Sequence, residues 1–354
     1  MSISEQTSIW LCRLSSSLLL GITLLFPLKL LGAEQSVPQT EQAVPQTAQA
    51  VPQTAQAVPQ TQQSDRFDSM DAPRDYLSGK IVSFASSIDR FFGGDRHYQE
   101  SNQSVFQLDL TRVAGFNGNR KFDLAARLNL RLPVTEGRLH LLIETDPEKN
   151  ITSEPTPAQG QTVLRNQVVA PSSVALAARY ETAAANVWHF STDAGLKFPI
   201  PIKPFVRARG SFSAPMGEWR LKAAESVYWF NTIGVGETSQ FDLERFISEP
   251  ALFRATSTAT WLNDKQNFDL RQDLSIYHTL NDRTALLYQA SVIGVSNPQY
   301  QVTDYVVQML YRYRMHREWL FFELSPQLHF PRVMNYQSSP ALSMRLEALF
   351  DESR

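Results

Sequence analysis

The strongest constraint on the fold is a two-residue alternation that recurs along the chain from residue 105 onward. The stretch NFDLRQDLSIYHT, residues 267–279, carries Asp269, Arg271 and Asp273 on one set of alternate positions and mostly apolar residues on the other. Because successive side chains of a β-strand point to opposite faces, this stretch is expected to form a strand with one charged face and one apolar face.

The same alternation appears in KFDLAARLNLRL, RLHLLIE, VWHFSTDAGLKF, DYVVQMLYRYR and ALSMRLEALF. Each run places charged or polar side chains on one face and Leu, Phe, Val, Tyr or Met on the other. The pattern predicts fourteen strands. Their ranges are 105–114, 121–132, 136–146, 172–182, 187–198, 204–213, 217–230, 232–245, 251–261, 267–279, 283–296, 301–314, 318–331 and 340–350.

The N-terminal segment has the features of a secretion signal. Arg13 precedes an apolar run over 14–33, which ends on the small residues Gly32 and Ala33. This pattern is typical of a signal peptide over 1–33, and the alternative is an N-terminal membrane anchor. The single cysteine, Cys12, lies in this segment. A processed chain would therefore have no internal disulfide and no cysteine nucleophile.

A linker and a helix are expected between this segment and the strands. Residues 34–64 repeat VPQTAQA with a proline in every copy, which excludes a helix and indicates a polar, semi-extended tether. Within 65–104, apolar residues recur at helical spacing over 75–92, and Gly93 and Gly94 follow. We expect an amphipathic helix that braces or plugs a larger body, or lies on a membrane surface.

Two architectures accommodate strands of this kind. In a soluble sandwich the apolar faces meet each other, whereas in a membrane barrel they meet lipid and the polar faces line the lumen. The predicted strands are long enough for a tilted membrane crossing and follow a secretion signal, which favours the barrel. Aromatic residues near the strand ends are suited to interfacial girdles. They are Phe122, Trp188, Phe198, Phe212, Trp219, Trp261, Tyr311, Tyr313, Phe330 and Phe350.

The sequence therefore predicts an all-β fold, an antiparallel transmembrane β-barrel of about fourteen strands over 105–350, with twelve strands as the alternative count. If both ends of the barrel lie on the periplasmic side, connections after odd-numbered strands lie on the outer side of the membrane. Those connections should then be longer than the connections after even-numbered strands. The long linker 147–171 fits this rule. Two places fit less well: alternation weakens over 217–245, and Pro326 lies inside a proposed strand although proline cannot donate to the ladder.

The last strand adds a further feature. SMRLEALF places Met344, Leu346, Ala348 and Phe350 on one face and ends on phenylalanine. In this strand and in the whole series over 105–350, the chain resembles bacterial outer-membrane β-barrel proteins. The resemblance implies contact with outer-membrane lipid and insertion by the barrel-assembly machinery through the C-terminal strand. The short polar tail 351–354 would follow the barrel, and the N-terminal segment would lie in the periplasm.

Composition and spacing exclude several classes of function. The formal net charge of -2 provides no basic field for nucleic acid. The six histidines lie in separate runs without the spacing of metal ligands, and no phosphate-binding glycine loop is found. We therefore expect no cofactor, no metal and no nucleic-acid partner.

The polar faces supply the candidate site. One interpretation is a mutually neutralising ionic network that stiffens the barrel. The other is a selectivity lining in which four arginines, at 207, 209, 312 and 314, attract anions. The candidate lumen-lining residues are Arg207, Arg209, Asp269, Arg271, Asp273, Arg312, Arg314, Glu323 and Arg345.

A catalytic alternative rests on His189 and Ser191, which resemble the His-x-Ser pair of outer-membrane phospholipases. The catalytic residues of those enzymes face lipid. Here Trp188 and Phe190 occupy the apolar face, so His189 and Ser191 are expected to point into the lumen as ordinary polar residues.

The sequence thus favours a passive pore or an envelope scaffold over an enzyme. Residues 34–103 are a candidate contact for a periplasmic partner. Two alternatives remain open at this point: an outer-membrane lipid-modifying hydrolase, and a soluble periplasmic β-rich binding protein.

Overall fold

The computed structural model describes residues 87–88, 91–92, 104–115, 120–132, 138–150, 167–169, 173–182, 187–316 and 319–351. The expected signal peptide, repeat linker and most of the tail lie outside these residues. Of the helix expected over 75–92, only Ser87, Ile88, Phe91 and Phe92 are described, each in helical conformation. That helix therefore stays a prediction.

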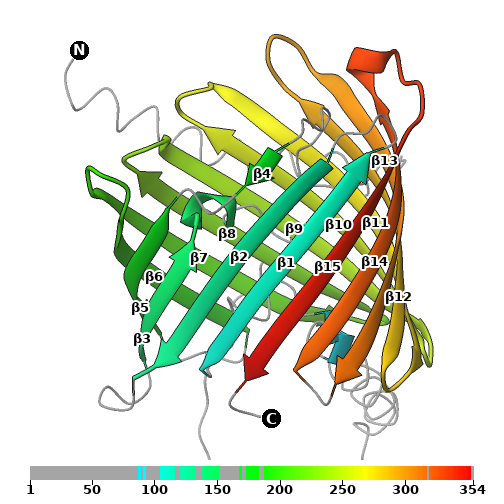
Figure 1. Ribbon diagram of the computed structural model, residues 1–354, viewed down its shortest axis with the longest axis horizontal. Coiled ribbons are helices and arrows are strands. Elements are labelled where there is room, and N and C mark those ends of the chain that lie inside the picture. Colours follow the sequence, from blue (N-terminus) through cyan, green and yellow to red (C-terminus); the bar gives the residue numbers. More distant parts are fainter. Residues whose placement is uncertain are drawn as a thin grey trace, which may run out of the picture. The chain divides into compact units, whose positions relative to one another are not determined.

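All strands of the described part belong to one sheet. β1 pairs with β2 on one side and with β15 on the other, so the sheet closes on itself. In Figure 1 this closing pair lies on the near wall, between β2 and β14. The strands are β1 (Val105–Gly115), β2 (Arg120–Arg131), β3 (Leu139–Thr145), β4 (Gln167–Val169), β5 (Val174–Glu181), β6 (Trp188–Lys197), β7 (Lys203–Met216), β8 (Trp219–Phe230), β9 (Gly234–Ser248), β10 (Ala251–Leu262), β11 (Asn267–Asn281), β12 (Thr284–Val295), β13 (Gln301–His316), β14 (Leu320–Pro331) and β15 (Ser339–Asp351).

Without β4, the sheet is a closed antiparallel barrel of fourteen strands. This confirms the predicted fold class, and it decides between fourteen and twelve strands. The region 217–245, where the alternation is weak, forms β8 and β9, which pair with each other along their whole length. The pattern is weak there because Glu225 and Glu237 occupy outward positions that carry apolar residues on other strands.

The short strand β4 was not predicted and lies in the expected linker 147–171, which also contains the 3-10 helix η2 (Pro147–Asn150). β3 pairs with the second half of β2, as in the pair Arg127↔Glu144. β4 runs parallel to β2 over its first half, as in the pair Phe122↔Val168. β4 therefore continues the pairing of β2 beyond the point where the short strand β3 ends. A strand this short has no alternation for sequence analysis to detect.

Pro326 lies within β14 and faces outward. On the β15 side it lies opposite Leu342. On the β13 side the register passes from Gln308↔Gln327 to Tyr311↔Leu324, so the ladder is interrupted around the proline. The missing backbone donor is thus tolerated as a local break on one side of the strand.

The connections follow the predicted rule in part: 132–138 and 182–187, which follow even-numbered strands of the barrel, have seven and six residues, whereas the others at that rim are tight. Gly217 and Glu218 alone join β7 to β8, Asp282 and Arg283 join β11 to β12, and another two-residue turn joins β9 to β10. At the other rim the connections are longer than these two-residue turns, and the one between β14 and β15 contains the 3-10 helix η3 (Arg332–Met334). The chain enters β1 and leaves β15 at the rim that carries the tight turns.

The two faces of the sheet are sorted by polarity in the opposite sense to a soluble protein. On β11, Asp273 and Ser275 are buried, whereas Leu274 is 49% exposed and Ile276 is 41% exposed. The same holds around the barrel, where polar and charged residues outnumber apolar ones in the buried set, whereas many Leu, Phe, Val and Tyr side chains are exposed. A closed sheet with its apolar face outward is the architecture of an outer-membrane β-barrel and excludes the sandwich.

Outward aromatic residues gather at the strand ends, as the girdle prediction requires. Trp188 at the start of β6 stacks on Phe190 and contacts Phe212 of β7. Trp319 stacks on Phe350 near the end of β15. Amphipathic rings of this kind favour the boundary between lipid tails and headgroups. No helix in the described residues has the length and hydropathy to cross a bilayer.

Candidate functional site: charge clusters on the inner wall

Strand register builds a charged cluster on the inner wall at the closing strands. Glu323 of β14 lies opposite Arg312 of β13 and Arg345 of β15. Glu347 of β15 lies opposite Asp109 of β1. All five side chains are buried, and we call them the C-terminal cluster.

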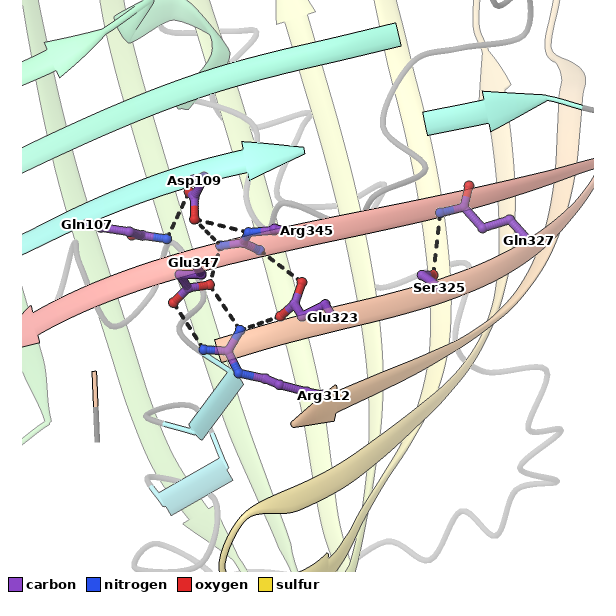
Figure 2. A network of polar contacts seen from close by, with 8 residues as sticks. All are labelled: Gln107, Asp109, Arg312, Glu323, Ser325, Gln327, Arg345 and Glu347. Carbon is purple, nitrogen blue, oxygen red and sulfur yellow. Dashed lines mark hydrogen bonds and ion pairs between the residues drawn. The ribbon is translucent and has the colours of Figure 1, made fainter. Parts of the chain in front are cut away.

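Two arginines hold the three carboxylates of this cluster (Figure 2). Arg312 donates to both oxygens of Glu347, with Nη1–Oε2 at 2.9 Å and Nη2–Oε1 at 3.0 Å, and it also contacts Glu323. Arg345 donates from Nε to Oδ1 of Asp109 at 3.0 Å and contacts both glutamates. The two-pronged pairing satisfies donors and acceptors together, which buried charges require.

A second cluster, the Asp193 cluster, comprises Glu144, Arg179, Asp193 and Arg207. Asp193 of β6 lies opposite Arg179 of β5 and Arg207 of β7. Arg179 donates from Nε to Oδ1 of Asp193 at 2.7 Å, and Arg207 also contacts Asp193. Arg207 then reaches Glu144 of β3, with Nη2–Oε1 at 2.9 Å. The cluster therefore ties together strands that are not all direct neighbours.

A third cluster, the Glu244 cluster, comprises Arg220, Glu244, Arg254 and Tyr277. Glu244 of β9 lies opposite Arg220 of β8 and Arg254 of β10. Its Oε2 accepts from Nε of Arg220 at 2.7 Å, and its Oε1 accepts from Nε of Arg254 at 2.8 Å. Arg254 also donates to the Tyr277 hydroxyl at 3.1 Å and lies 4.9 Å from the centroid of that ring.

One rule describes all three clusters: a carboxylate lies between two arginines contributed by the strands on either side. Asp193, Glu244 and Glu323 each occupy this central position. Opposite charges directly across a strand pair stabilise a sheet and fix its register. The arrangement is chemically suited to stiffening the wall and cancelling its charge. It is poorly suited to leaving arginines available for a passing anion.

The described N-terminal residues contact this inner wall. The Phe91 and Phe321 rings meet edge to face at 5.8 Å, and the Phe92 and Tyr277 rings meet at 5.2 Å. The guanidinium of Arg312 lies 4.1 Å from the Phe321 ring centroid and 5.9 Å from that of Phe91. Cation–π contacts of this kind gain strength when water is excluded. Whether the segment braces or plugs the barrel stays a prediction.

Most of the sequence-predicted site residues enter ion pairs. Arg207 belongs to the Asp193 cluster, and Arg312, Glu323 and Arg345 belong to the C-terminal cluster. The structure brings these residues together in two places, which β2 separates along the wall.

The three predicted residues of β11 form no large cluster. Arg271 pairs with Asp273, with Nε–Oδ2 at 2.8 Å, and it also donates to Ser291 of β12. Asp269 is exposed near the strand end and accepts from the Asn267 amide at 3.0 Å.

The last two predicted arginines are held differently. Arg209 is half-buried and donates from Nη1 to the Ser226 hydroxyl at 3.2 Å. Arg314 lies 5.4 Å from the Phe91 ring centroid and 5.9 Å from that of Phe321. Within the described residues, no carboxylate pairs with Arg314. The selectivity lining therefore stays a prediction, with these two arginines as its remaining support.

Sequence reasoning missed Arg179, Arg220, Glu244 and Arg254 as cluster members. Arg220 and Glu244 lie in the region where alternation is weak. Arg254 is the only charged residue in ALFRATSTAT. Small side chains occur at successive positions there, so the sequence does not show which alternate residues face inward.

His189 and Ser191 lie on the inner face, and Trp188 and Phe190 are exposed on the outer face, as the alternation predicts. The catalytic alternative is not tested by this placement. Among the side chains that the structure describes, no group of His, Cys, Asp and Glu is arranged to hold a metal ion.

No family model matches the chain, and no curated protein matches it. Solved structures that resemble it include OmpT of Vibrio cholerae lacking loop L8, an outer-membrane protein, with 13% identity and a TM-score of 0.43 over 70% of this chain and 98% of that one. OprB of Pseudomonas putida shows 11% identity and a TM-score of 0.45 over 73% and 97%. The outer-membrane channel DcaP of Acinetobacter baumannii shows 8% identity and a TM-score of 0.39 over 70% and 96%. These likenesses transfer no residue role or activity, and the barrel assignment rests on this chain's own strand pairing.

Proposed function

We propose that the chain is an integral outer-membrane barrel whose lumen is a passive pore with little preference between anions and cations. The observation that carries this proposal is the lining: most buried inward side chains are polar or charged, and the buried carboxylates of the three clusters lie between arginines. A polar wall supports water in the lumen, and paired charges leave little net field to select ions.

The inner wall between the C-terminal cluster and β11 favours a neutral polar molecule as the solute that passes through the pore. Gln308 of β13 donates to the Gln289 amide oxygen at 2.8 Å, and Gln289 donates to Ser291 at 3.2 Å. Gln327 of β14 continues this band of amides and hydroxyls. Such groups can both donate and accept hydrogen bonds, so they suit hydroxylated solutes better than ions.

A second candidate function, a closed scaffold, is favoured by the contacts of Phe91 and Phe92 with the inner wall. Those rings lie against Phe321 and Tyr277, beside Arg312, whose side chain is 0% exposed. In the scaffold hypothesis the N-terminal segment braces the barrel permanently and nothing passes. In the pore hypothesis the same segment only narrows the lumen.

Planar-bilayer recording of the full-length protein separates these functions. The pore hypothesis predicts stepwise conductance with similar permeabilities for K⁺ and Cl⁻ under a salt gradient. A strong preference for Cl⁻ would contradict the neutral lining and would instead support the selectivity role of Arg209 and Arg314. A flat baseline with correctly folded protein would support the scaffold.

The double variant Phe91→Ala/Phe92→Ala tests the role of the N-terminal contacts. We predict a larger conductance step than in the unmodified protein, because two rings that hold the segment against the wall are removed. The matched control is Phe122→Ala/Phe190→Ala, which removes two exposed outward rings and should leave the step unchanged. Equal steps in all three proteins would contradict a narrowing role for Phe91 and Phe92.

The N-terminal segment and the last strand direct the protein to the outer membrane and into it. Residues 1–33 act as the signal peptide, and 34–103 lie in the periplasm and are open to a partner there. The alternating strand β15 serves as the signal for the assembly machinery. No catalytic role is proposed for His189: a lipid hydrolase would lose its activity in His189→Ala, whereas a pore would keep its conductance.

A further inference from the structure

The outer wall of β8–β10 departs from the rest of the lipid-facing surface. Exposed large apolar side chains occur on most of the remaining strands of the barrel. Between Trp229 and Leu274, Ile247 is the one large apolar side chain among the described residues that is exposed. The outward positions between them carry half-buried apolar residues such as Phe241, Leu243 and Trp261, interspersed with small and acidic residues. The most distinctive are Glu225, Glu237, Ser239, Ala255, Ser257 and Ala259, which we call the acidic wall.

The carboxyl groups of the acidic wall face the hydrocarbon side. Glu225 alternates with the buried inward residue Ser226, and Glu237 alternates with the buried Thr238. Glu225 lies opposite Ser239, and Glu237 occupies the next outward position of β9 after Ser239 toward the rim with the longer connections. Acidic side chains in contact with lipid are costly and are rarely placed there without a partner.

A basic residue occupies the opposite side of the barrel. Arg112 of β1 is exposed and alternates with inward residues such as Asp109 on the same strand. Within the described part of the chain, Arg112 has neither a hydrogen bond nor an ion pair. Bulky apolar side chains surround it, among them Leu108, Phe122 and Met344, and all of them are exposed. We call this the arginine wall.

The two walls match in depth. Arg112 lies three positions before Gly115, the end of β1, and Glu237 lies three positions after Gly234, the start of β9. Both strand ends belong to the rim with the longer connections. Glu225 lies further along the wall, toward the middle of β8. An arginine carried at the depth of Arg112 would therefore meet the carboxyl pair of a neighbouring molecule.

From these observations we propose that the arginine wall of one barrel docks against the acidic wall of a second copy of this chain in the membrane. The charges are complementary, and the small side chains of Ser239 and Ala259 beside Glu225 leave room for the bulky side chains around Arg112. β9 is the seventh neighbour of β1 in both directions around the fourteen-stranded sheet. Because the two walls lie on opposite sides, repeated docking produces a straight row of barrels and not a closed ring.

Cysteine cross-linking in lipid vesicles tests this contact, using full-length protein with Cys12→Ser so that only engineered thiols react. Leu110→Cys and Ala223→Cys place thiols on the two walls, each two positions from Arg112 and Glu225 respectively. The protein that carries both substitutions should give a ladder of dimers, trimers and larger species after treatment with a short thiol cross-linker. Proteins with either substitution alone should not form this ladder, because like walls do not meet.

Arg112→Leu in the double-cysteine protein should reduce the ladder at least several-fold, and Arg112→Lys should retain most of it. Arg112→Leu places an apolar side chain toward lipid, so loss of the fold is not expected, and heat-modifiable gel migration verifies the barrel. As a control, Val292→Cys on the outer face of β12 takes the place of either Leu110→Cys or Ala223→Cys. Neither of these proteins should give the ladder. Three results would overturn the proposal: a ladder that is insensitive to Arg112→Leu, cross-linking dominated by like walls, or adducts with a different protein in place of the ladder.

Discussion

At the scale of single residues, the inner wall shows how a barrel keeps many charges out of bulk water. Each buried arginine of the clusters has carboxylate partners on neighbouring strands, and Arg312 has two. Such pairs are weak evidence for net stability, because desolvation offsets much of the attraction. Removal of one partner is different, because it leaves the other charge buried and uncompensated.

This difference predicts unequal effects for two arginines. Arg312→Ala leaves Arg345 as the one cluster arginine for Asp109, Glu323 and Glu347. The loss of a buried partner should lower the free energy of unfolding by about 3–5 kcal/mol. Arg245→Ala is the matched control, because Arg245 pairs with Glu218 at 2.6 Å while their side chains are 46% and 65% exposed. That pair should contribute less than about 1 kcal/mol.

Urea unfolding in lipid vesicles, followed by tryptophan fluorescence, measures both changes. Similar unfolding midpoints for the two variants would show that burial does not increase the contribution of the C-terminal cluster to the free energy of unfolding.

At the scale of single strands, the sequence was most informative where polarity alternates over a full membrane crossing. β11 and β13 were predicted nearly residue by residue, because lipid on one face and a polar lumen on the other impose a period of two. β4 could not be predicted, since it spans Gln167–Val169 only and its pairing depends on where β3 ends. The clusters were predicted only in part, because they depend on the register between strands as well as on the phase within each one.

The same period predicts a depth-dependent cost for charge on the outer face of β11. Leu274→Arg, near the middle of the strand, should destabilise the barrel by about 2–4 kcal/mol, whereas Leu280→Arg, at its end, should cost about 0–1 kcal/mol. The comparison is matched, because the two leucines are 49% and 48% exposed on the same face.

The measurement is the shift in denaturant midpoint for refolding into vesicles. Equal costs at both positions would mean that this face does not cross a hydrocarbon layer.

At the scale of the whole molecule, closure through β1 and β15 makes the inverted distribution of polarity possible. A sheet with open edges would leave unpaired backbone donors and acceptors in lipid, at a cost of several kcal/mol for each group. The register Val105↔Asp351 to Gly115↔Ala341 pairs the first and last strands along their length. Closure also forces all inward side chains into one shared space, which is why charged residues distant in sequence, such as Asp109 and Arg345, form contacts.

The central claim is that hydrocarbon covers the outer face of this closed sheet. The most direct test is nitroxide scanning along β11 from Gln272 to His278 in outer-membrane lipid, with accessibility to oxygen and to a water-soluble nickel complex measured at each position. Oxygen accessibility should oscillate with a period of two, with high values at Leu274 and Ile276 and low values at Asp273 and Ser275. High accessibility of Leu274 and Ile276 to the nickel complex, or the absence of any oscillation, would contradict the claim.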